Sequence, residues 1–194
     1  VGALYADGQG TEQNFEEASK WMTKSAQQGD TGAEMTLGNF YRDGRGVPKD
    51  FKESLKWYTK SAEKGEPYAQ FQLGAQYANG QGTEMNFKES IKWLKLAAKQ
   101  GDADAEKNLK IVENLEKQRV EEERIAAKGD AKELFELGWK YRNENLGKAI
   151  KWYKLSAKKG NYDAQVNLQN IADVAYNDKD YETALEIYEV LAGA

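Results

Sequence analysis

The sequence contains no cysteine and no histidine among its 194 residues. Without cysteine there are no disulfide bonds and no thiolate nucleophiles, although this absence does not fix the cellular compartment. The two absences together exclude zinc sites built from these residues and remove the commonest general base. No apolar run approaches the roughly 20 residues that a membrane-spanning helix needs. We therefore expect no cofactor, no membrane insertion and no enzymatic activity.

The chain also lacks a basic field. Charged residues make up 31% of it, but 28 lysines and arginines are outnumbered by 32 acidic residues, which gives a net charge of -4. A protein that binds nucleic acid is expected to carry a clustered excess of positive charge. The composition therefore predicts a soluble globular protein that does not bind nucleic acid.

What the chain does contain is an internal repeat of 36 residues. Several residue types recur at this step over residues 1–105. The columns are Trp21, Trp57 and Trp93; Gly8, Gly44 and Gly80; Gly10, Gly46 and Gly82; Phe15, Phe51 and Phe87; Gly29, Gly65 and Gly101; Tyr5, Tyr41 and Tyr77; and Ala33, Ala69 and Ala105. So many columns in one register indicate a repeat array.

Each unit reads as a pair of helices. Ala33, Leu37 and Tyr41 share one helical face, and Gly44 follows where a helix end favours a left-handed residue. Asp50 is placed to cap the second helix, with Glu53 completing a capping box. The same arrangement is expected at Asn14 and Glu17 and at Asn86 and Glu89, and Asp180 is expected to cap the last helix. Gly38 and Gly74 lie inside first helices, where we expect them to permit close approach of the paired helix.

The later units are less regular. We divide the chain into three regular repeats in 1–105, the first truncated at its N-terminus, an irregular helical repeat in 106–128, a repeat with a short loop in 129–164 and a terminal hairpin in 165–194. All are expected to form one continuous solenoid. The stretch 106–128 lacks the glycine loop, so it either bends the stack as a hairpin or runs as one long helix. Because the sequence starts inside a first helix, we expect it to be part of a longer array.

Three motifs suggest chemistry and have simpler explanations. Gly44-Arg45-Gly46 has the look of a phosphate loop, but such a loop follows a strand, whereas this element follows a helix and recurs in three units. We interpret it as a turn. The acidic loops at 7–12 and 43–50 lack the alternating oxygen ligands of a calcium site. The lysine series of the second helices is interpreted as a solvated face, with an anionic surface as the alternative.

The columns around Leu37-Gly38, Tyr41, Gly46-Val47 and Trp57-Tyr58 resemble the Sel1-like repeat family, a relative of the tetratricopeptide repeats. Ala33 or Ala69, Gly44, Asp50, Ser54, Ala62 and Gly65 also match its pattern. The final unit looks more like a plain tetratricopeptide repeat. Departures include Thr11 and Thr83 in place of valine, and Met22 and Leu94 in place of tyrosine. The resemblance implies an all-α fold, a right-handed α/α superhelical solenoid of helical hairpins.

The resemblance also implies a binding surface. In tetratricopeptide geometry the first helices line an inner groove, and the matching positions here are Met35, Asn39, Arg42, Phe71, Ala75, Ala78, Phe135, Trp139, Arg142, Val166 and Asn170. Four of the five tryptophans occupy the core column, and Trp139 does not. Trp139 and Phe135 either belong to a binding surface, for which aromatic and arginine side chains are typical, or pack against the irregular repeat.

These features predict a non-catalytic adaptor that binds a protein or peptide in the groove. A glycan or cell-wall binder is the alternative, because aromatic and amide side chains also suit sugars, and a carboxylate-based hydrolase is the third hypothesis. The sequence does not fix the compartment. Family resemblance slightly favours the bacterial envelope or secretion over the cytoplasm.

Overall fold

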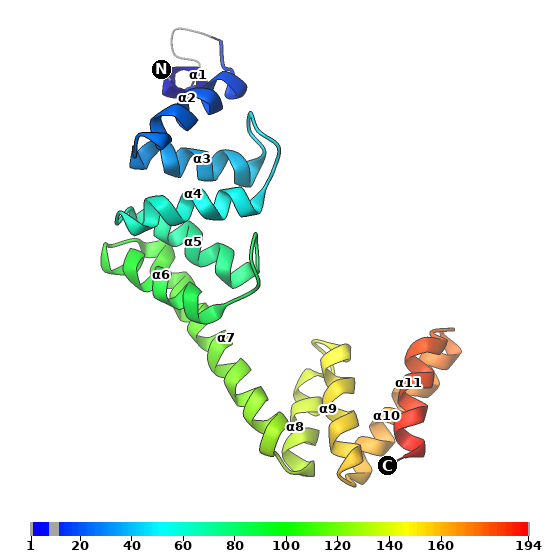
Figure 1. Cartoon of the computed structure of the whole chain (residues 1–194). Coiled ribbons are helices and arrows are strands. Elements are labelled where there is room, and N and C mark those ends of the chain that lie inside the picture. Colours follow the sequence, from blue (N-terminus) through cyan, green and yellow to red (C-terminus); the bar gives the residue numbers. More distant parts are fainter. Residues whose placement is uncertain (1, 8–11, 194) are drawn as a thin grey trace. The chain divides into compact units, whose positions relative to one another are not determined.

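The computed structural model describes residues 2–7 and 12–193 of the chain (Figure 1). In these residues it contains eleven helices and no strand. The helices are α1 (Gly2–Asp7), α2 (Phe15–Gln27), α3 (Thr31–Asp43), α4 (Phe51–Glu63), α5 (Pro67–Asn79), α6 (Phe87–Lys99), α7 (Ala103–Lys128), α8 (Ala131–Tyr141), α9 (Leu146–Lys158), α10 (Tyr162–Asn177) and α11 (Tyr181–Ala192). Apart from α7, each packs mainly on its neighbours along the chain, as the pairs α3–α4, α5–α6 and α8–α9 show. The protein is an all-α helical repeat solenoid.

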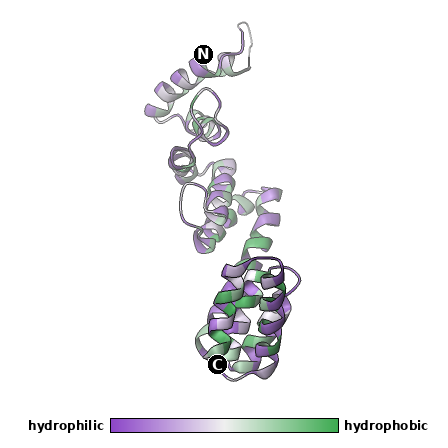
Figure 2. Cartoon of the chain, turned by 90° about the vertical axis from the view of Figure 1, so that its right-hand side faces the viewer, coloured by the Kyte–Doolittle hydropathy of each residue, from purple (hydrophilic) through white to green (hydrophobic). Residues whose placement is uncertain are grey.

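The chain divides into two compact units, residues 1–117 and 118–194. The predicted division into repeats within one continuous solenoid stays a prediction, and each unit is described below by itself. The stretch 106–128, for which the sequence left two alternatives, belongs to the single 26-residue helix α7. None of the described helices is apolar and long enough to cross a membrane. Figure 2 shows hydrophilic and hydrophobic residues interspersed along the ribbon.

The Gly-x-Gly loops are turns, as predicted. Gly44 and Gly80 follow the last residues of α3 and α5 with φ of 72° and 65°, and their backbone N–H groups donate to Phe40 O and Gln76 O. The corresponding glycines of the first repeat, Gly8 and Gly10, and the acidic loop at 7–12 lie mostly outside the described residues. The left-handed conformation favours glycine because it has no Cβ atom.

The second glycine of each loop has a further role that the sequence did not reveal. A Cβ atom on Gly46 would lie 2.0 Å from Phe15 O, and one on Gly82 would lie 2.3 Å from Phe51 O. Both contacts are with the start of the second helix of the preceding repeat. The loop therefore packs backbone against backbone between consecutive repeats, which only glycine permits.

The glycines inside first helices act as predicted. A Cβ atom on Gly38 would lie 2.6 Å from the Tyr58 ring, and one on Gly74 would lie 2.8 Å from Leu94 Cγ. In the second unit, a Cβ atom on Gly138 would lie 2.5 Å from the Tyr153 ring. The absence of a side chain lets the second helix of each hairpin approach the first, which offsets the low helix propensity of glycine.

The capping prediction is only half right. Asn14, Asp50 and Asn86 accept backbone hydrogen bonds at the starts of α2, α4 and α6, and Asp180 does so at α11. However, the glutamates expected to complete the capping boxes form ion pairs with lysines three residues later in the sequence. These ion pairs are Glu17–Lys20, Glu53–Lys56 and Glu89–Lys92. The reciprocal box forms at α8, between Asp130 and Glu133.

The core tryptophan column is correct at three positions and wrong at one. Trp57, Trp93 and Trp152 are buried, whereas Trp21 is 40% exposed. Trp57 packs in one cluster with Leu37 and Phe40 of α3 and with Ala18 and Ala26 of α2. Its cluster therefore joins its own repeat to the preceding one. The only helix among the described residues before α2 is the short helix α1. Trp21 stays partly exposed and lines an open cavity of about 640 Å³, which Met35 also lines.

Candidate functional site

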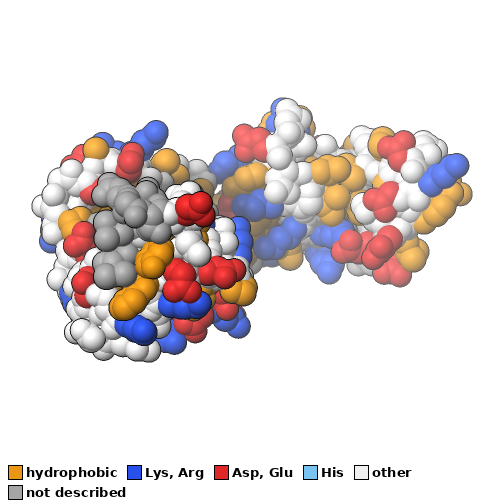
Figure 3. All heavy atoms as spheres, turned by 90° about the horizontal axis from the view of Figure 1, so that it is seen from above, with side chains coloured by type: hydrophobic (Ala, Val, Ile, Leu, Met, Phe, Trp, Pro, Cys, Tyr) orange, Lys and Arg blue, Asp and Glu red, His pale blue; other side chains and the backbone are white. Residues whose placement is uncertain are grey.

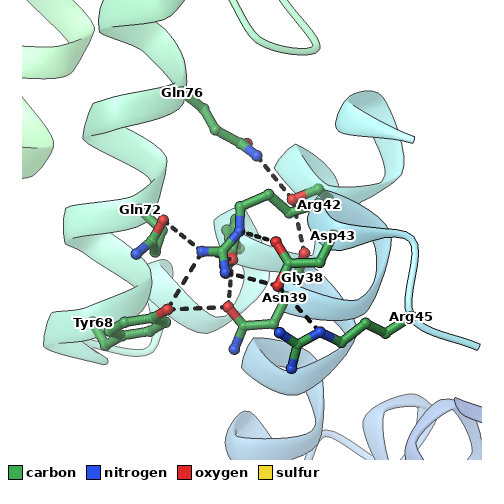
Figure 4. Close-up of polar contacts among 10 residues, drawn as sticks. Gly38, Asn39, Arg42, Asp43, Arg45, Tyr68, Gln72 and Gln76 are labelled. Atoms are coloured by element: carbon green, nitrogen blue, oxygen red, sulfur yellow. Dashed lines mark hydrogen bonds and ion pairs between the residues drawn. The ribbon is translucent and has the colours of Figure 1, made fainter. Parts of the chain in front are cut away.

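Two of the predicted groove residues, Asn39 and Arg42, form part of a polar network within the first unit (Figure 4). The Arg42 guanidinium donates to Tyr58 Oη at 3.1 Å, Tyr68 Oη at 3.4 Å and Gln72 Oε1 at 2.9 Å. Its Nε and Nη2 atoms also donate to the Asp43 carboxylate at 2.8 and 3.1 Å. These side chains come from three helices, α3, α4 and α5. Figure 4 shows Tyr68 and Gln72 of α5 directed toward the Arg42 guanidinium. Arg42 thus joins two consecutive repeats.

Asn39 completes this network as an acceptor. The hydroxyl groups of Tyr58 and Tyr68 donate to Asn39 Oδ1 at 2.7 and 3.1 Å. The hydrogen bonds with Asp43 raise the pKa of Arg42 above its usual value and lower that of Asp43. Burial raises the pKa of Tyr58, so its hydroxyl stays protonated and remains a donor. Asn39 and Arg42 are therefore occupied by partners inside the chain.

The other predicted residues of the first unit are also partly covered. Phe71 and Ala78 pack against a cluster formed by Leu94, Ala97 and Ala105. Ala75 and Met35 are half-buried, and Met35 lines the cavity beside Trp21. The first-unit residues thus face their own neighbouring helices more than the tetratricopeptide analogy implied.

The second unit exposes its predicted residues more strongly. Trp139 is 48% exposed, and the Arg142 guanidinium lies 3.7 Å from the centre of its ring. Arg142 Nη1 also donates to Trp139 O at 2.7 Å. Phe135 is half-buried, with ring centroids 6.1 Å from Trp139 and 5.6 Å from Tyr153. We call Phe135, Trp139 and Arg142 the Trp139 face.

Packing against the irregular repeat accounts for Phe135 but not for Trp139. Phe135 packs on the core cluster of the second unit, which includes Ile125 of α7. Trp139 is outside that cluster and, with Phe135 and Glu136, lines a small apolar pocket of about 190 Å³. Val166 is 40% exposed on α10, where Asn170 lines a separate cavity of about 540 Å³ with Leu146 and Val174.

The charged surface has the mixed character that was predicted for the lysine series. Lys95 pairs with Glu113, Lys148 with Glu122 and Lys154 with Glu186. Figure 3 shows acidic and basic side chains interspersed over the face drawn. In the part of the chain that the structure describes, no group of three or more acidic side chains is placed to hold a metal ion.

Sequence reasoning missed three residues that define these sites, namely Tyr68, Gln72 and Tyr153. Tyr58 and Tyr153 follow tryptophans of the core column, and neither was predicted to belong to a site. A buried tyrosine needs a partner for its hydroxyl, and this requirement was a usable signal. For Tyr68 and Gln72 the sequence contains no such signal, because their role depends on an arginine in the preceding repeat.

The helical pairs, the glycine contacts between repeats and the inter-repeat network define the chain as an all-α repeat protein. Four segments, residues 1–30, 33–66, 67–102 and 129–161, match the family model described as Sel1 repeat. They cover well over half of the sequence, so the chain belongs to the Sel1 repeat family.

Solved structures are similar over nearly the whole chain. A Sel1 repeat protein from Oxalobacter formigenes is 32% identical, with a TM-score of 0.57, over 97% of this chain and 83% of that one. A protective antigen present in uropathogenic Escherichia coli strains, which displays the same repeat fold, is 29% identical with a TM-score of 0.57. The match covers 98% of this chain but 44% of the antigen, so this chain spans less than half of its length. No curated protein matches the chain.

Proposed function

We propose that this protein is a non-catalytic interaction module that binds a protein partner through the Trp139 face. Sel1 repeats typically mediate protein interactions, and the family is typically non-enzymatic. The proposal goes further because it assigns a surface to this particular chain. The observation that carries it is the half-exposed Trp139 with Arg142 stacked on its ring.

Physical chemistry favours this surface over the rest of the predicted groove. Tryptophan and arginine are enriched in the small set of residues that dominate binding energy at interfaces. A tryptophan held by a stacked guanidinium and by Phe135 loses little conformational freedom when a partner covers it. Asn39 and Arg42 already have internal partners, so we assign them to holding the array together. Val166 and Asn170 remain candidate outer contacts of the same unit.

A capture experiment tests the proposal. The Trp139→Ala/Arg142→Ala variant is compared with the unmodified chain in crosslinking pulldowns from the native host. We expect the main crosslinked partner to be lost while helicity by circular dichroism is kept. Trp21→Ala, which removes another half-exposed tryptophan, is the matched control and should capture the partner normally. Equal capture by all three chains would contradict the proposal.

Glycan binding is a second candidate, and the exposed tyrosines of the second unit favour it. Tyr176 and Tyr181 are both more than half exposed, and their rings meet edge to face with centroids 5.5 Å apart. Tyr162 is 73% exposed. Binding on a glycan array that is lost in Tyr176→Ala and kept in Trp139→Ala would favour this function over the first.

A further inference from the structure

The second unit contains a copy of the Arg42 network from which the acceptors are missing. Aligned on Leu37-Gly38 and Leu137-Gly138, Arg142 occupies the position of Arg42, and Tyr153 on the paired helix occupies that of Tyr58. Trp139 stands at the position of Asn39. At the position of Asp43 the second unit has Asn143. The two donors are thus retained, while the amide acceptor and the carboxylate are both replaced.

The replacement leaves a buried donor without a partner. Tyr153 is 1% exposed, and its hydroxyl makes no hydrogen bond within the described residues. In the first unit the same hydroxyl, on Tyr58, donates to Asn39 at 2.7 Å. A buried polar group without a partner is costly, so natural proteins rarely keep one without a reason.

Arg142 is an exposed cation without a carboxylate partner among the described residues. Its guanidinium contacts the ring and the backbone oxygen of Trp139. Burial raises the pKa of Tyr153, and the positive charge of Arg142 is near enough to lower it in part. The nearby Glu136 lies 3.9 Å from the Lys132 ammonium and lines the small pocket together with Phe135 and Trp139.

We infer that the Trp139 face is a site for an acidic side chain of a protein partner. The partner's aspartate or glutamate takes the part that Asp43 and Asn39 play inside the first unit. Its carboxylate accepts hydrogen bonds from Arg142 and from the Tyr153 hydroxyl, and a neighbouring apolar residue of the partner covers the Trp139 ring. Arg142 turns from the indole toward the carboxylate, which opens the path to the hydroxyl. The inference rests on the proposed function and specifies the chemistry of the partner.

Stability measurements test whether the Tyr153 hydroxyl lacks an acceptor that an asparagine at position 139 would supply. Trp139→Asn restores the side chain found at the equivalent position of the first unit, and Trp139→Ala is its matched control. Alanine has the higher helix propensity, so propensity alone predicts that the alanine variant is the more stable. We expect the opposite, a higher thermal midpoint for Trp139→Asn, and we expect Tyr153→Phe to abolish the difference. An alanine variant as stable as the asparagine variant would overturn the inference.

Peptide selection tests the ligand chemistry. A displayed library of random heptapeptides, with both peptide ends joined to the carrier, is selected on the unmodified chain. We expect enrichment of aspartate or glutamate beside an apolar residue, and a loss of at least about tenfold in binding to Arg142→Gln, as removal of one member of a desolvated charge pair predicts. No enrichment, or acidic peptides that bind Arg142→Gln equally, would overturn the inference. A second library, whose peptides have free C-termini, is selected in parallel. Enrichment of acidic peptides from this library alone would also overturn the inference, because the terminal carboxylate rather than a side chain would then be the ligand.

The same selection separates this inference from the proposed function. Apolar peptides that require Trp139 but neither an acidic residue nor Arg142 would overturn the acidic ligand and leave the Trp139 face as a binding surface. Peptides whose binding is unchanged in Trp139→Ala would overturn both.

Discussion

At the scale of single residues, Gly46 satisfies two separate constraints. Its φ of 67° is unfavourable for any residue with a Cβ atom, and its position against Phe15 O leaves no room for that atom. Gly65 has only the first constraint. Its φ is 96°, but beyond its two chain neighbours no residue comes within 4 Å of the place that a Cβ atom would take. A comparison of substitutions at Gly46 and Gly65 therefore distinguishes the cost of backbone strain from the cost of steric conflict between repeats.

We predict that Gly65→Ala lowers the free energy of unfolding by about 1–2 kcal/mol, the usual cost of a left-handed non-glycine residue. Gly46→Ala should cost clearly more, because the loop must also move away from α2. Urea titration of both variants measures the difference. Equal costs would show that the loop contact contributes nothing to stability.

The tryptophan column gives a second comparison between matched residues. Trp57 is 8% exposed in the core of the first unit, whereas Trp21 is 40% exposed at the same repeat position. We predict a loss of about 3–5 kcal/mol for Trp57→Ala, as for other buried aromatic residues. Trp21→Ala should cost much less. Thermal and urea unfolding give both values, and an unchanged midpoint for Trp57→Ala would refute its place in the core.

At the scale of helices, one contact between the two helices of a repeat appears in two chemical forms. Glu34 of α3 is buried and forms an ion pair of 2.8 Å with Lys64, which also donates to Gly29 O. One repeat later, Gln100 Nε2 donates to Gln70 Oε1 at 2.9 Å and to Gly65 O at 3.0 Å. The geometry is kept while a charged pair is exchanged for an amide pair.

This exchange predicts a strong coupling between positions 34 and 64. Lys64→Gln alone leaves the Glu34 carboxylate buried without its cation and should cost on the order of 1–3 kcal/mol, since Lys64 is 39% exposed and solvent screens part of the pair. Glu34→Gln/Lys64→Gln recreates the amide pair and should recover most of that loss. A double-mutant cycle measures the coupling energy. Additive effects would show that the two side chains act independently.

At the scale of the whole molecule, the chain consists of two compact units, 1–117 and 118–194. In repeat proteins each element contacts only its neighbours, so destabilisation spreads over a limited distance. We predict that Trp57→Ala reduces native-state hydrogen-exchange protection in residues 12–99 and leaves the protection of α8–α11 unchanged. Trp152→Ala should do the reverse. Loss of protection throughout the chain in either variant would contradict this independence.

Much of the fold could be predicted because it depends on local chemistry that recurs every 36 residues. The stops at Gly44 and Gly80 and the caps at Asp50 and Asn86 involve residues close in sequence. The exposure of Trp21 could not be predicted, since it depends on which helix lies against it. The helix α7 contains no glycine or proline, but the sequence did not decide between a helix and a hairpin.

The candidate site was less predictable, because it depends on contacts between residues that are far apart in the sequence. Arg42 and Arg142 occupy one repeat position, and the analogy gave both the same role. Their difference depends on Asn39 against Trp139 and on Tyr68 and Gln72 of the following repeat. The position of a residue in the repeat indicates its place on the helix. Whether its side chain is free to bind a partner depends on the residues that surround it.

The contact of Gly46 with the start of α2 has a consequence for how such a chain lengthens. The regular repeat formed by α3 and α4 carries both halves of the contact, a glycine loop and a helix start, but the halves that meet belong to different copies. Gly46 meets Phe15 of the preceding repeat, and Gly82 of the following repeat meets Phe51. Tandem duplication of one whole repeat therefore creates a correct new junction at once, with no further substitution. An insertion of any other length separates a loop from its helix start. We expect natural and engineered length variants of this array to differ by whole repeats.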